Sequence, residues 1–202
     1  MISVSEIVPG GVVIFFPSYS YEEEVYKSWS KSGIILKIER EKKFLREPKS
    51  SSEVTNILND YKKTIDSNKP YKGAILSSVI GGKMSEGINF SDDYGRCIIV
   101  VGLPYPNTQD LELKEKMKYL DSISKNGGNE YYEGLCMKAV NQSIGRSIRH
   151  IKDYSTICLL DQRYLQERIQ KKLPMWIQKR IKNCEKYDNV TKNLKDFFEI
   201  KR

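Results

Sequence analysis

Short apolar runs without polar alternation are the feature that most limits how this chain can fold. They are rich in valine and isoleucine and occupy residues 12–16, 34–38, 74–80, 97–101 and 156–160. A strand that is apolar on both sides must be covered on both sides, which is typical of parallel sheets in α/β proteins. The pattern predicts an α/β fold with a mostly parallel sheet between layers of helices.

Between these runs, apolar residues recur at helical spacing, which predicts helices over residues 21–30, 54–65 and 113–123. In folds of this kind, ligands bind where the strands end at the carboxyl edge of the sheet. Three turns directly follow expected strands, at residues 17–20, 81–90 and 161–164. We therefore expect these turns to lie near the functional site.

Positive charge is concentrated toward the end of the sequence. The chain has 202 residues and a formal net charge of +8, and residues 162–202 alone hold 12 Lys and Arg against 5 Asp and Glu, a net of +7. We divide the chain into a domain at residues 1–170 and a basic helical extension at residues 171–202, which Trp176 is expected to anchor. Such charge suits a nucleic-acid partner or a surface covered by another domain.

The cysteines do not form a metal-binding or disulfide pattern. Cys97, Cys136, Cys158 and Cys184 are widely spaced, no Cys-x-x-Cys pair occurs, and His150 is the only histidine. We therefore predict no metal site in this chain. No apolar run approaches the length of a membrane span and the N-terminus lacks a signal-peptide pattern, which favours an intracellular protein without membrane contact.

The glycine-rich turn at residues 81–90 invites comparison with a P-loop, and the comparison fails. Ser77 stands where a P-loop has its first glycine, and Met84 follows Lys83 where a serine or threonine is needed. The chain is thus not expected to cradle a nucleoside triphosphate alone. The small residues of this turn still let backbone amides approach a phosphate, and the Ser85 hydroxyl and the Asn89 amide can hydrogen-bond a ligand.

A second segment carries two arginines beside an apolar pattern. Wound as one helix, residues 142–150 turn Gln142, Arg146 and Arg149 to the same side. The opposite side collects the apolar residues Met137, Val140, Ile144, Ile148 and Ile151. This arrangement suits presentation of guanidinium groups to a phosphate, or else an ordinary amphipathic helix whose arginines form surface salt bridges.

Together these segments resemble a known family. Residues 85–92 (Ser-Glu-Gly-Ile-Asn-Phe-Ser-Asp) and 142–150 (Gln-Ser-Ile-Gly-Arg-Ser-Ile-Arg-His) are similar to motifs V and VI of the XPD-like iron–sulfur DNA helicases of superfamily 2. The similarity extends over nearly the whole chain, through residues 13–19 (motif IV), 102–107, 160–164 and 172–176. Asn89, where much of the family has aspartate, and residues 131–142 look most like the sister-chromatid-cohesion helicase branch.

The resemblance implies the second, C-terminal motor domain of a helicase, with a RecA-like three-layer fold. A first motor domain, absent from this chain, would hold ATP and Mg²⁺ through its P-loop and would carry the cysteines of the iron–sulfur cluster. The four cysteines of this chain would then not be cluster ligands. The isolated chain is expected to be nearly inactive as an ATP hydrolase.

The resemblance also implies roles for residues at the ATP site. Arg146 and Arg149 would be arginine fingers that reach the γ-phosphate, and Gln142 would orient the nucleotide or its attacking water. Gly87 and Asn89 would contact the nucleotide from this side. Glu86 is placed with them, where it can also pair with a neighbouring arginine.

Ser18, Tyr19, Lys83 and Ser85 would grip the phosphate backbone of single-stranded or forked DNA, with movement in the 5′-to-3′ direction. Further expectations from the family are a nuclear location and protein partners in repair or cohesion. An RNA helicase, and a non-catalytic module that binds nucleic acid or protein, are the alternatives.

Several of these residues also have purely structural interpretations. Ser18 and Tyr19 can cap the following helix. Asp161 and Arg163 are expected to form an ion pair that closes the last strand. His150 is expected to pack or to cap at the end of the arginine helix.

Overall fold

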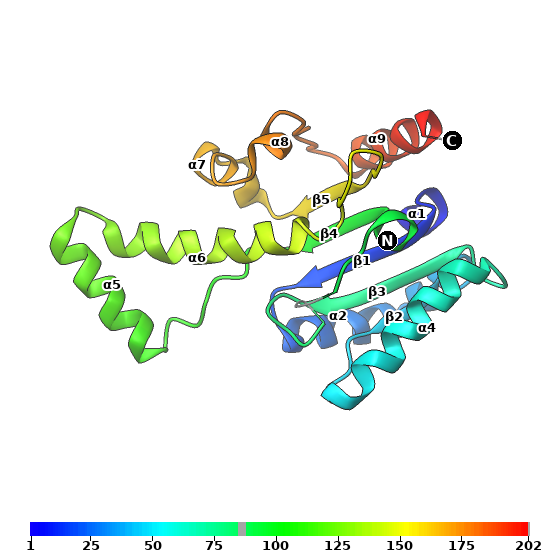
Figure 1. Cartoon of the computed structure of the whole chain (residues 1–202), viewed down its shortest axis with the longest axis horizontal. Helices are drawn as coiled ribbons and strands as arrows, with labels where there is room; N and C mark the ends of the chain where they lie inside the picture. Colours follow the sequence, from blue (N-terminus) through cyan, green and yellow to red (C-terminus); the bar gives the residue numbers. More distant parts are fainter. Residues whose placement is uncertain (85–87, 202) are drawn as a thin grey trace.

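The computed structural model describes residues 1–84 and 88–201, and in these residues one sheet of parallel strands forms the centre (Figure 1). Its strands are β1 (Gly10–Phe16), β2 (Lys43–Arg46), β3 (Gly73–Val79), β4 (Cys97–Val101) and β5 (Thr156–Leu160). Their order is β2-β3-β1-β4-β5, with β1 at the centre. Val13 of β1, for example, lies opposite Leu76 of β3 and Ile98 of β4.

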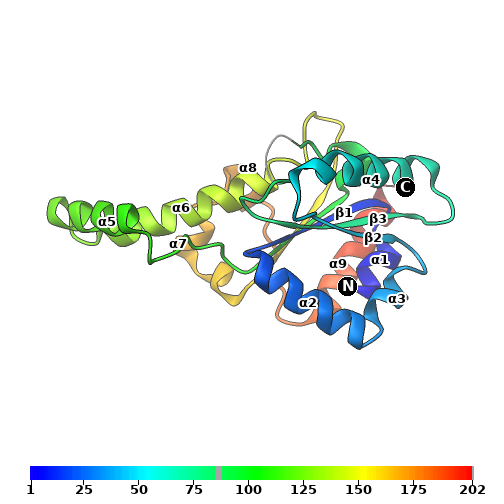
Figure 2. The same ribbon diagram turned by 90° about the horizontal axis from the view of Figure 1, so that it is seen from below.

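Helices cover both faces of this sheet, as Figure 2 shows. One face carries α1 (Ile2–Ile7), α2 (Tyr19–Lys31), α3 (Ile34–Ile38) and α9 (Tyr187–Ile200). The other carries α4 (Val54–Ser67), α6 (Gly127–Ile144), α7 (Glu167–Gln170) and α8 (Met175–Gln178). Alternate residues of β1 face opposite ways, so Val12 and Ile14 join one buried cluster while Val13 and Phe15 join the other. The prediction of a three-layer α/β fold is confirmed.

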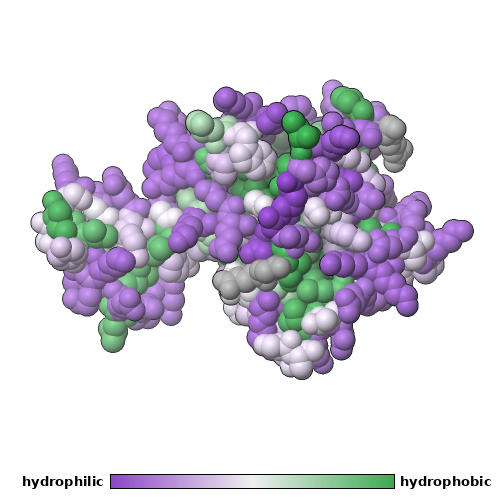
Figure 3. All heavy atoms as spheres, viewed as in Figure 1, coloured by the Kyte–Doolittle hydropathy of each residue, from purple (hydrophilic) through white to green (hydrophobic). Residues whose placement is uncertain are grey.

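Helix α5 (Leu111–Ile123) and α6 form a hairpin that projects from the sheet (Figures 1 and 2). Figure 3 shows a largely hydrophilic surface with apolar side chains on this hairpin, where Leu111 and Ile123 are exposed. Among the described residues, no helix combines the length and apolar character needed to cross a membrane.

The predicted strand at residues 34–38 is wrong, because these residues form α3. Gly33 starts the helix in the left-handed conformation (φ 72°), and Ile35 and Ile38 are then buried one helical turn apart while Leu36 is exposed. The strand in this part of the chain is β2, whose residues Lys-Phe-Leu-Arg include two charges. Because β2 pairs with β3 alone, it is an edge strand and needs no apolar cover on both sides.

The basic extension contributes to the core. Leu194 and Phe198 of α9 are buried in the same cluster as Val4 of α1 and Val8, which follows α1. In α8, Ile177 is buried whereas Trp176 is 39% exposed, so Ile177 rather than Trp176 provides the main apolar anchor of this segment. The division at residue 170 stays a prediction.

One lysine is buried at the amino ends of the strands. Lys42 is fully buried, and its ammonium donates to the carbonyl oxygens of Gly10 (2.6 Å) and Lys72 (3.3 Å). Gly10 is the first residue of β1, and Lys72 directly precedes β3. Burial lowers its pKa from 10.5 to about 8. Lys42 therefore joins the amino ends of two central strands at an electrostatic cost.

This cost predicts an unusual pH dependence of stability. Between pH 8 and pH 10.5 the unfolded chain keeps a proton that folded Lys42 has released, so the free energy of unfolding rises with pH across this range. The rise should total about 3 kcal/mol. Urea denaturation of the unaltered chain and of Lys42→Met at both ends of the range measures it, because the variant lacks the titrating group. The same pH response in both proteins would contradict this explanation.

Candidate functional site

The described residues include two groups of the side chains that the sequence predicts to be functional. The first group lies at the carboxyl edge of the sheet. Ser18 is the N-cap of α2, and its hydroxyl accepts a hydrogen bond from the backbone amide of Tyr21 at 3.2 Å. The capping interpretation of Ser18 is thus confirmed. Tyr19 begins the helix and is 39% exposed.

Tyr19 and Lys83 are brought together by a residue that the sequence analysis missed. The Tyr19 hydroxyl donates to Glu47 Oε1 at 2.5 Å and lies 3.4 Å from the backbone nitrogen of Lys83. Burial, followed by the hydrogen bond to Glu47, raises the pKa of Tyr19. Glu47 directly follows β2, so recognising that edge strand in the sequence would have placed this carboxylate at the carboxyl edge.

A pocket of about 270 Å³ lies at the same edge, next to the ends of β1, β4 and β5. Pro17, Tyr21, Leu160 and Arg163 are among its lining residues. Arg163 is held by Asp161 through hydrogen bonds of 2.9 and 2.7 Å, which confirms the predicted ion pair and lowers the pKa of Asp161. This part of the edge combines apolar walls with a fixed guanidinium.

The second group surrounds the two arginines, and here the predicted helix is wrong. Helix α6 ends at Ile144, so Arg146 lies in the turn after it and Arg149 in irregular chain, and the two do not share a helical face. Gly145 is a poor helix former, and the carbonyl of Arg146 accepts a hydrogen bond from the amide of Phe90 (3.1 Å) rather than from a later turn of the helix. Ile151, predicted to dock, is fully exposed.

Leaving the helix places the two arginines in different environments. Arg146 is 8% exposed, and its Nη1 donates to the carbonyl of Ile88 at 2.9 Å. Arg149 is exposed, and its Nη2 donates to the side-chain oxygen of Asn89. Gln142 lies exposed in the last turn of α6.

The structure thus gathers Arg146, Arg149 and Asn89 from segments nearly sixty residues apart. Ser85, Glu86 and Gly87, the other residues of the predicted site, lie outside the described residues. Because Asn89 is a neutral acceptor, it orients the Arg149 guanidinium and leaves its positive charge intact. A carboxylate in the same place would neutralise that charge. An exposed, oriented guanidinium of this kind can bind a phosphate group.

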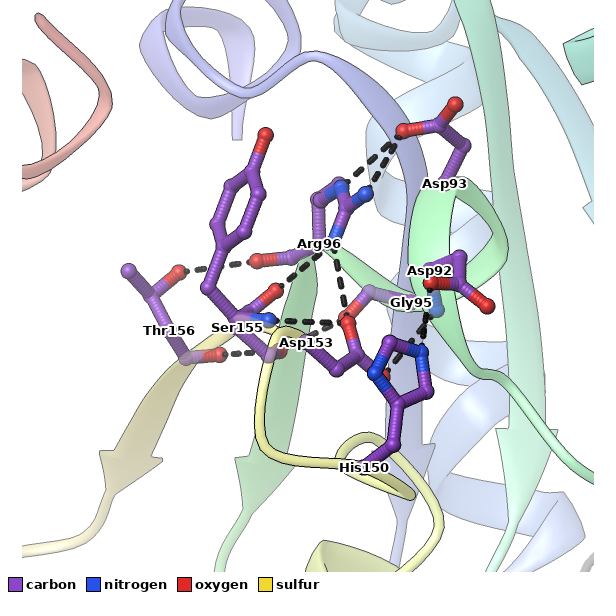
Figure 4. Close-up of polar contacts among 9 residues, drawn as sticks. Asp92, Asp93, Gly95, Arg96, His150, Asp153, Ser155 and Thr156 are labelled. Atoms are coloured by element: carbon purple, nitrogen blue, oxygen red, sulfur yellow. Dashed lines mark hydrogen bonds and ion pairs between the residues drawn. The ribbon is translucent and has the colours of Figure 1, made fainter. Parts of the chain in front are cut away.

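A polar network centred on Arg96 joins the two segments that hold this group (Figure 4). The Arg96 guanidinium donates to Asp93 Oδ1 (2.9 and 3.0 Å) and to Asp153 Oδ1 (3.0 Å), and it lies 3.9 Å from the ring centre of Tyr154. Asp93 belongs to the segment that carries Asn89, and Asp153 to the segment that carries Arg149. The network therefore fixes one segment relative to the other.

His150 strengthens the same connection. Its Nε2 lies 3.0 Å from Asp92 Oδ1, and the Asp92 amide donates to Asp153 Oδ2 at 3.2 Å (Figure 4). The prediction that His150 packs or caps at the end of the arginine helix is wrong, because that helix ends earlier and the imidazole pairs across the two segments.

The side chains of Asp92, His150 and Asp153 lie close enough to be compared with a metal site, since their ligand atoms are within 4.8 Å of one another. The Asp153 carboxylate, however, already accepts hydrogen bonds from Arg96 and from two backbone amides. The positive charge of Arg96 beside it disfavours a cation. We assign these side chains to the ion-pair network.

Comparisons with known proteins place this geometry in context. A family model described as "Helicase C-terminal domain" matches residues 1–180. The ATP-dependent DNA helicase CHL1 of Candida albicans is 52% identical over 90% of this chain and 22% of its own length. The ATP-dependent DNA helicase DDX11 of Danio rerio is 48% identical over 99% of this chain and 24% of its own length.

Among solved structures, "XPD_APO" is similar with a TM-score of 0.62 at 25% identity, over 85% of this chain and 32% of that chain. The RecA-like fold and the resemblance to XPD-like helicases are confirmed. The chain spans about a quarter of the length of the curated relatives it matches.

Proposed function

This chain belongs to the helicase C-terminal domain family, and from that premise we propose that it is the second motor domain of an ATP-dependent DNA helicase. The observation that carries the proposal is the exposed Arg149 guanidinium, oriented by Asn89 in a chain whose sequence has no P-loop. Such a group can contact a phosphate of a nucleotide that is held mainly by another domain.

At the ATP site, Arg149 stabilises the charge that develops on the γ-phosphate during hydrolysis, and Arg146 acts as the second finger. A supplied arginine finger accelerates comparable reactions by about 10³–10⁵-fold. Gln142 orients the nucleotide or its attacking water, and Glu86, Gly87 and Asn89 line this side of the site. ATP and Mg²⁺ are held mainly by a first motor domain that this chain does not contain.

At the DNA site, Tyr19 and Lys83 contact the phosphate backbone of a single strand, together with Ser18 and Ser85. Such contacts position a strand without reading its sequence. Closing and opening of the cleft between the two motor domains during each ATP cycle then moves the strand in the 5′-to-3′ direction. An iron–sulfur cluster in the longer protein, a nuclear location and partners in DNA repair or cohesion are further parts of this proposal.

Reconstitution tests the proposal. The isolated chain should hydrolyse almost no ATP, and adding the separately produced first motor domain of the same protein should give hydrolysis that single-stranded DNA stimulates. Matched single-stranded RNA serves as the control for the choice of nucleic acid. DNA binding by the reconstituted pair without any hydrolysis would instead support a non-catalytic module.

A further inference from the structure

Glu47 is the organising carboxylate of the carboxyl edge. Its Oε1 accepts hydrogen bonds from the Tyr19 hydroxyl (2.5 Å) and, at 3.4 Å, from the Met84 amide. Its Oε2 accepts from the Ser78 hydroxyl (2.6 Å) and the Val79 amide (2.9 Å). Four donors from three segments of the chain therefore converge on one side chain.

Two of these segments hold the proposed DNA contacts Tyr19 and Lys83, and the third is the strand end between them. Tyr19 begins α2, Ser78 and Val79 end β3, and Met84 belongs to the turn that follows β3. Within that turn, a Cβ added to Gly82 would come within 2.5 Å of Glu47 Oε1 and 2.8 Å of the Tyr19 hydroxyl. The close approach of the turn to Glu47 thus depends on the absence of a side chain at Gly82.

A carboxylate in this place is unexpected on charge alone. Its negative charge lies at the Tyr19 hydroxyl and near the backbone of Lys83, where a phosphate would have to approach, and by itself it would repel DNA. Its oxygens, however, are engaged by hydroxyl and amide donors, and hydrogen bonds to a charged acceptor are stronger than neutral ones. A role in holding the surrounding groups in place explains why a carboxylate stands where its charge would repel DNA.

We propose that Glu47 is a positioning residue that holds Tyr19 and the turn bearing Lys83 in the geometry that grips the phosphate backbone of single-stranded DNA. This inference rests on the proposed DNA-gripping function and adds the residue that makes the grip rigid. Glu47 acts through Tyr19 and the Met84 amide and does not touch the DNA itself.

Loss of the Glu47 carboxylate should leave the fold intact, because α2 has a separate anchor. Glu22 of α2 accepts two hydrogen bonds from Arg46 (2.8 and 2.6 Å) and one from the Ser77 hydroxyl (2.7 Å). Helix α2 therefore stays attached to β2 and β3 when Glu47 is changed. Thermal unfolding of each variant checks this point.

The charge and the hydrogen bonds of Glu47 predict opposite results for Glu47→Gln. Removing a negative charge beside DNA should tighten binding, whereas a glutamine has one acceptor oxygen and must release part of the network. If Glu47 positions the grip, Glu47→Gln weakens binding of the full chain to a fluorescent oligodeoxythymidylate by about tenfold. Glu53→Gln, an exposed carboxylate in the 3₁₀ turn Ser51–Glu53, is the matched control and should change affinity by no more than about twofold.

The salt dependence of binding gives a readout that a general loss of stability would not move. If the phosphate contact of Lys83 is lost, the slope of log affinity against log salt becomes shallower by about 0.7. Tyr19→Phe removes only the hydroxyl that donates a hydrogen bond to Glu47. Combining it with Glu47→Gln should weaken DNA binding by less than the sum of the two single effects on the binding free energy.

Each result decides a separate question. Tighter or unchanged binding by Glu47→Gln, with normal binding by the unaltered chain, would overturn the positioning role and leave the DNA-gripping function standing. Absence of binding by the unaltered, folded chain would overturn the DNA-gripping function itself, and the inference with it.

Discussion

Arg149→Ala should lower DNA-stimulated ATP hydrolysis by about 10³-fold or more in a protein that contains both motor domains, while ATP affinity changes little. Arg149 is exposed and is held by the neutral Asn89, so its charge is available to a phosphate on a facing domain. The effect falls on the rate because the developing charge of the transition state, more than the ground state, needs the guanidinium. Steady-state hydrolysis and equilibrium ATP binding, measured on the same preparation, separate the two quantities.

Arg149→Lys is the informative companion to this variant. Lysine keeps the positive charge and loses the planar fork of donors, so its rate should fall between that of alanine and that of arginine. Near-normal turnover of Arg149→Ala would remove Arg149 from the catalytic proposal. Arg146 is a less clean target, because it is buried and donates to the carbonyl of Ile88, so its loss also disturbs the segment that carries Asn89.

Arg96→Met should lower the free energy of unfolding by about 3–5 kcal/mol, which is the usual cost of removing one partner from a buried ion pair. The side chain of Arg96 is 9% exposed and that of Asp153 is not exposed at all. The variant would leave the Asp153 carboxylate buried without its cation, and methionine does not replace the donors to Asp93. Urea denaturation of the isolated chain measures the change.

The pair of Arg163 and Asp161 provides the matched control, because Arg163 is 43% exposed and the ion pair is similar in length. Arg163→Met should cost no more than about 1 kcal/mol, as is common for ion pairs near the surface. If Arg96→Met and Arg163→Met had equal effects, the network around Arg96 would not be the connection that holds the two segments together.

The central strands could be predicted from the sequence because their burial is local in origin. Residues 12–16 and 97–101 are apolar throughout and lie in the middle of the sheet, where both faces are covered. Residues 34–38 are apolar apart from Lys37, but burial of every third or fourth residue satisfies a helix equally. The edge strand β2 has no apolar run that would predict it, because an edge strand tolerates charged residues on its open side.

The residues of the candidate site can be named from the sequence, but their arrangement in space cannot. The sequence contains Arg149 and Asn89, but their contact joins segments sixty residues apart, and no periodicity encodes it. Just beyond the end of α6, the Arg146 carbonyl accepts a hydrogen bond from the Phe90 amide, a tertiary contact that the helical pattern does not encode. Glu47 and Arg96 are ordinary charged residues in the sequence, and their importance depends on partners that the fold supplies.

The packing of α9 against α1 has a consequence for biosynthesis. These helices are far apart in the sequence, and both join the buried cluster that contains Val12 and Ile14 of β1, on the face that α2 and α3 also cover. A nascent chain emerges from the ribosome N-terminal part first, so α1, α2, α3 and the central strands are made before α9 can complete this layer. Until α9 is available, the apolar residues that it covers stay exposed, and exposed apolar surface of this kind favours aggregation.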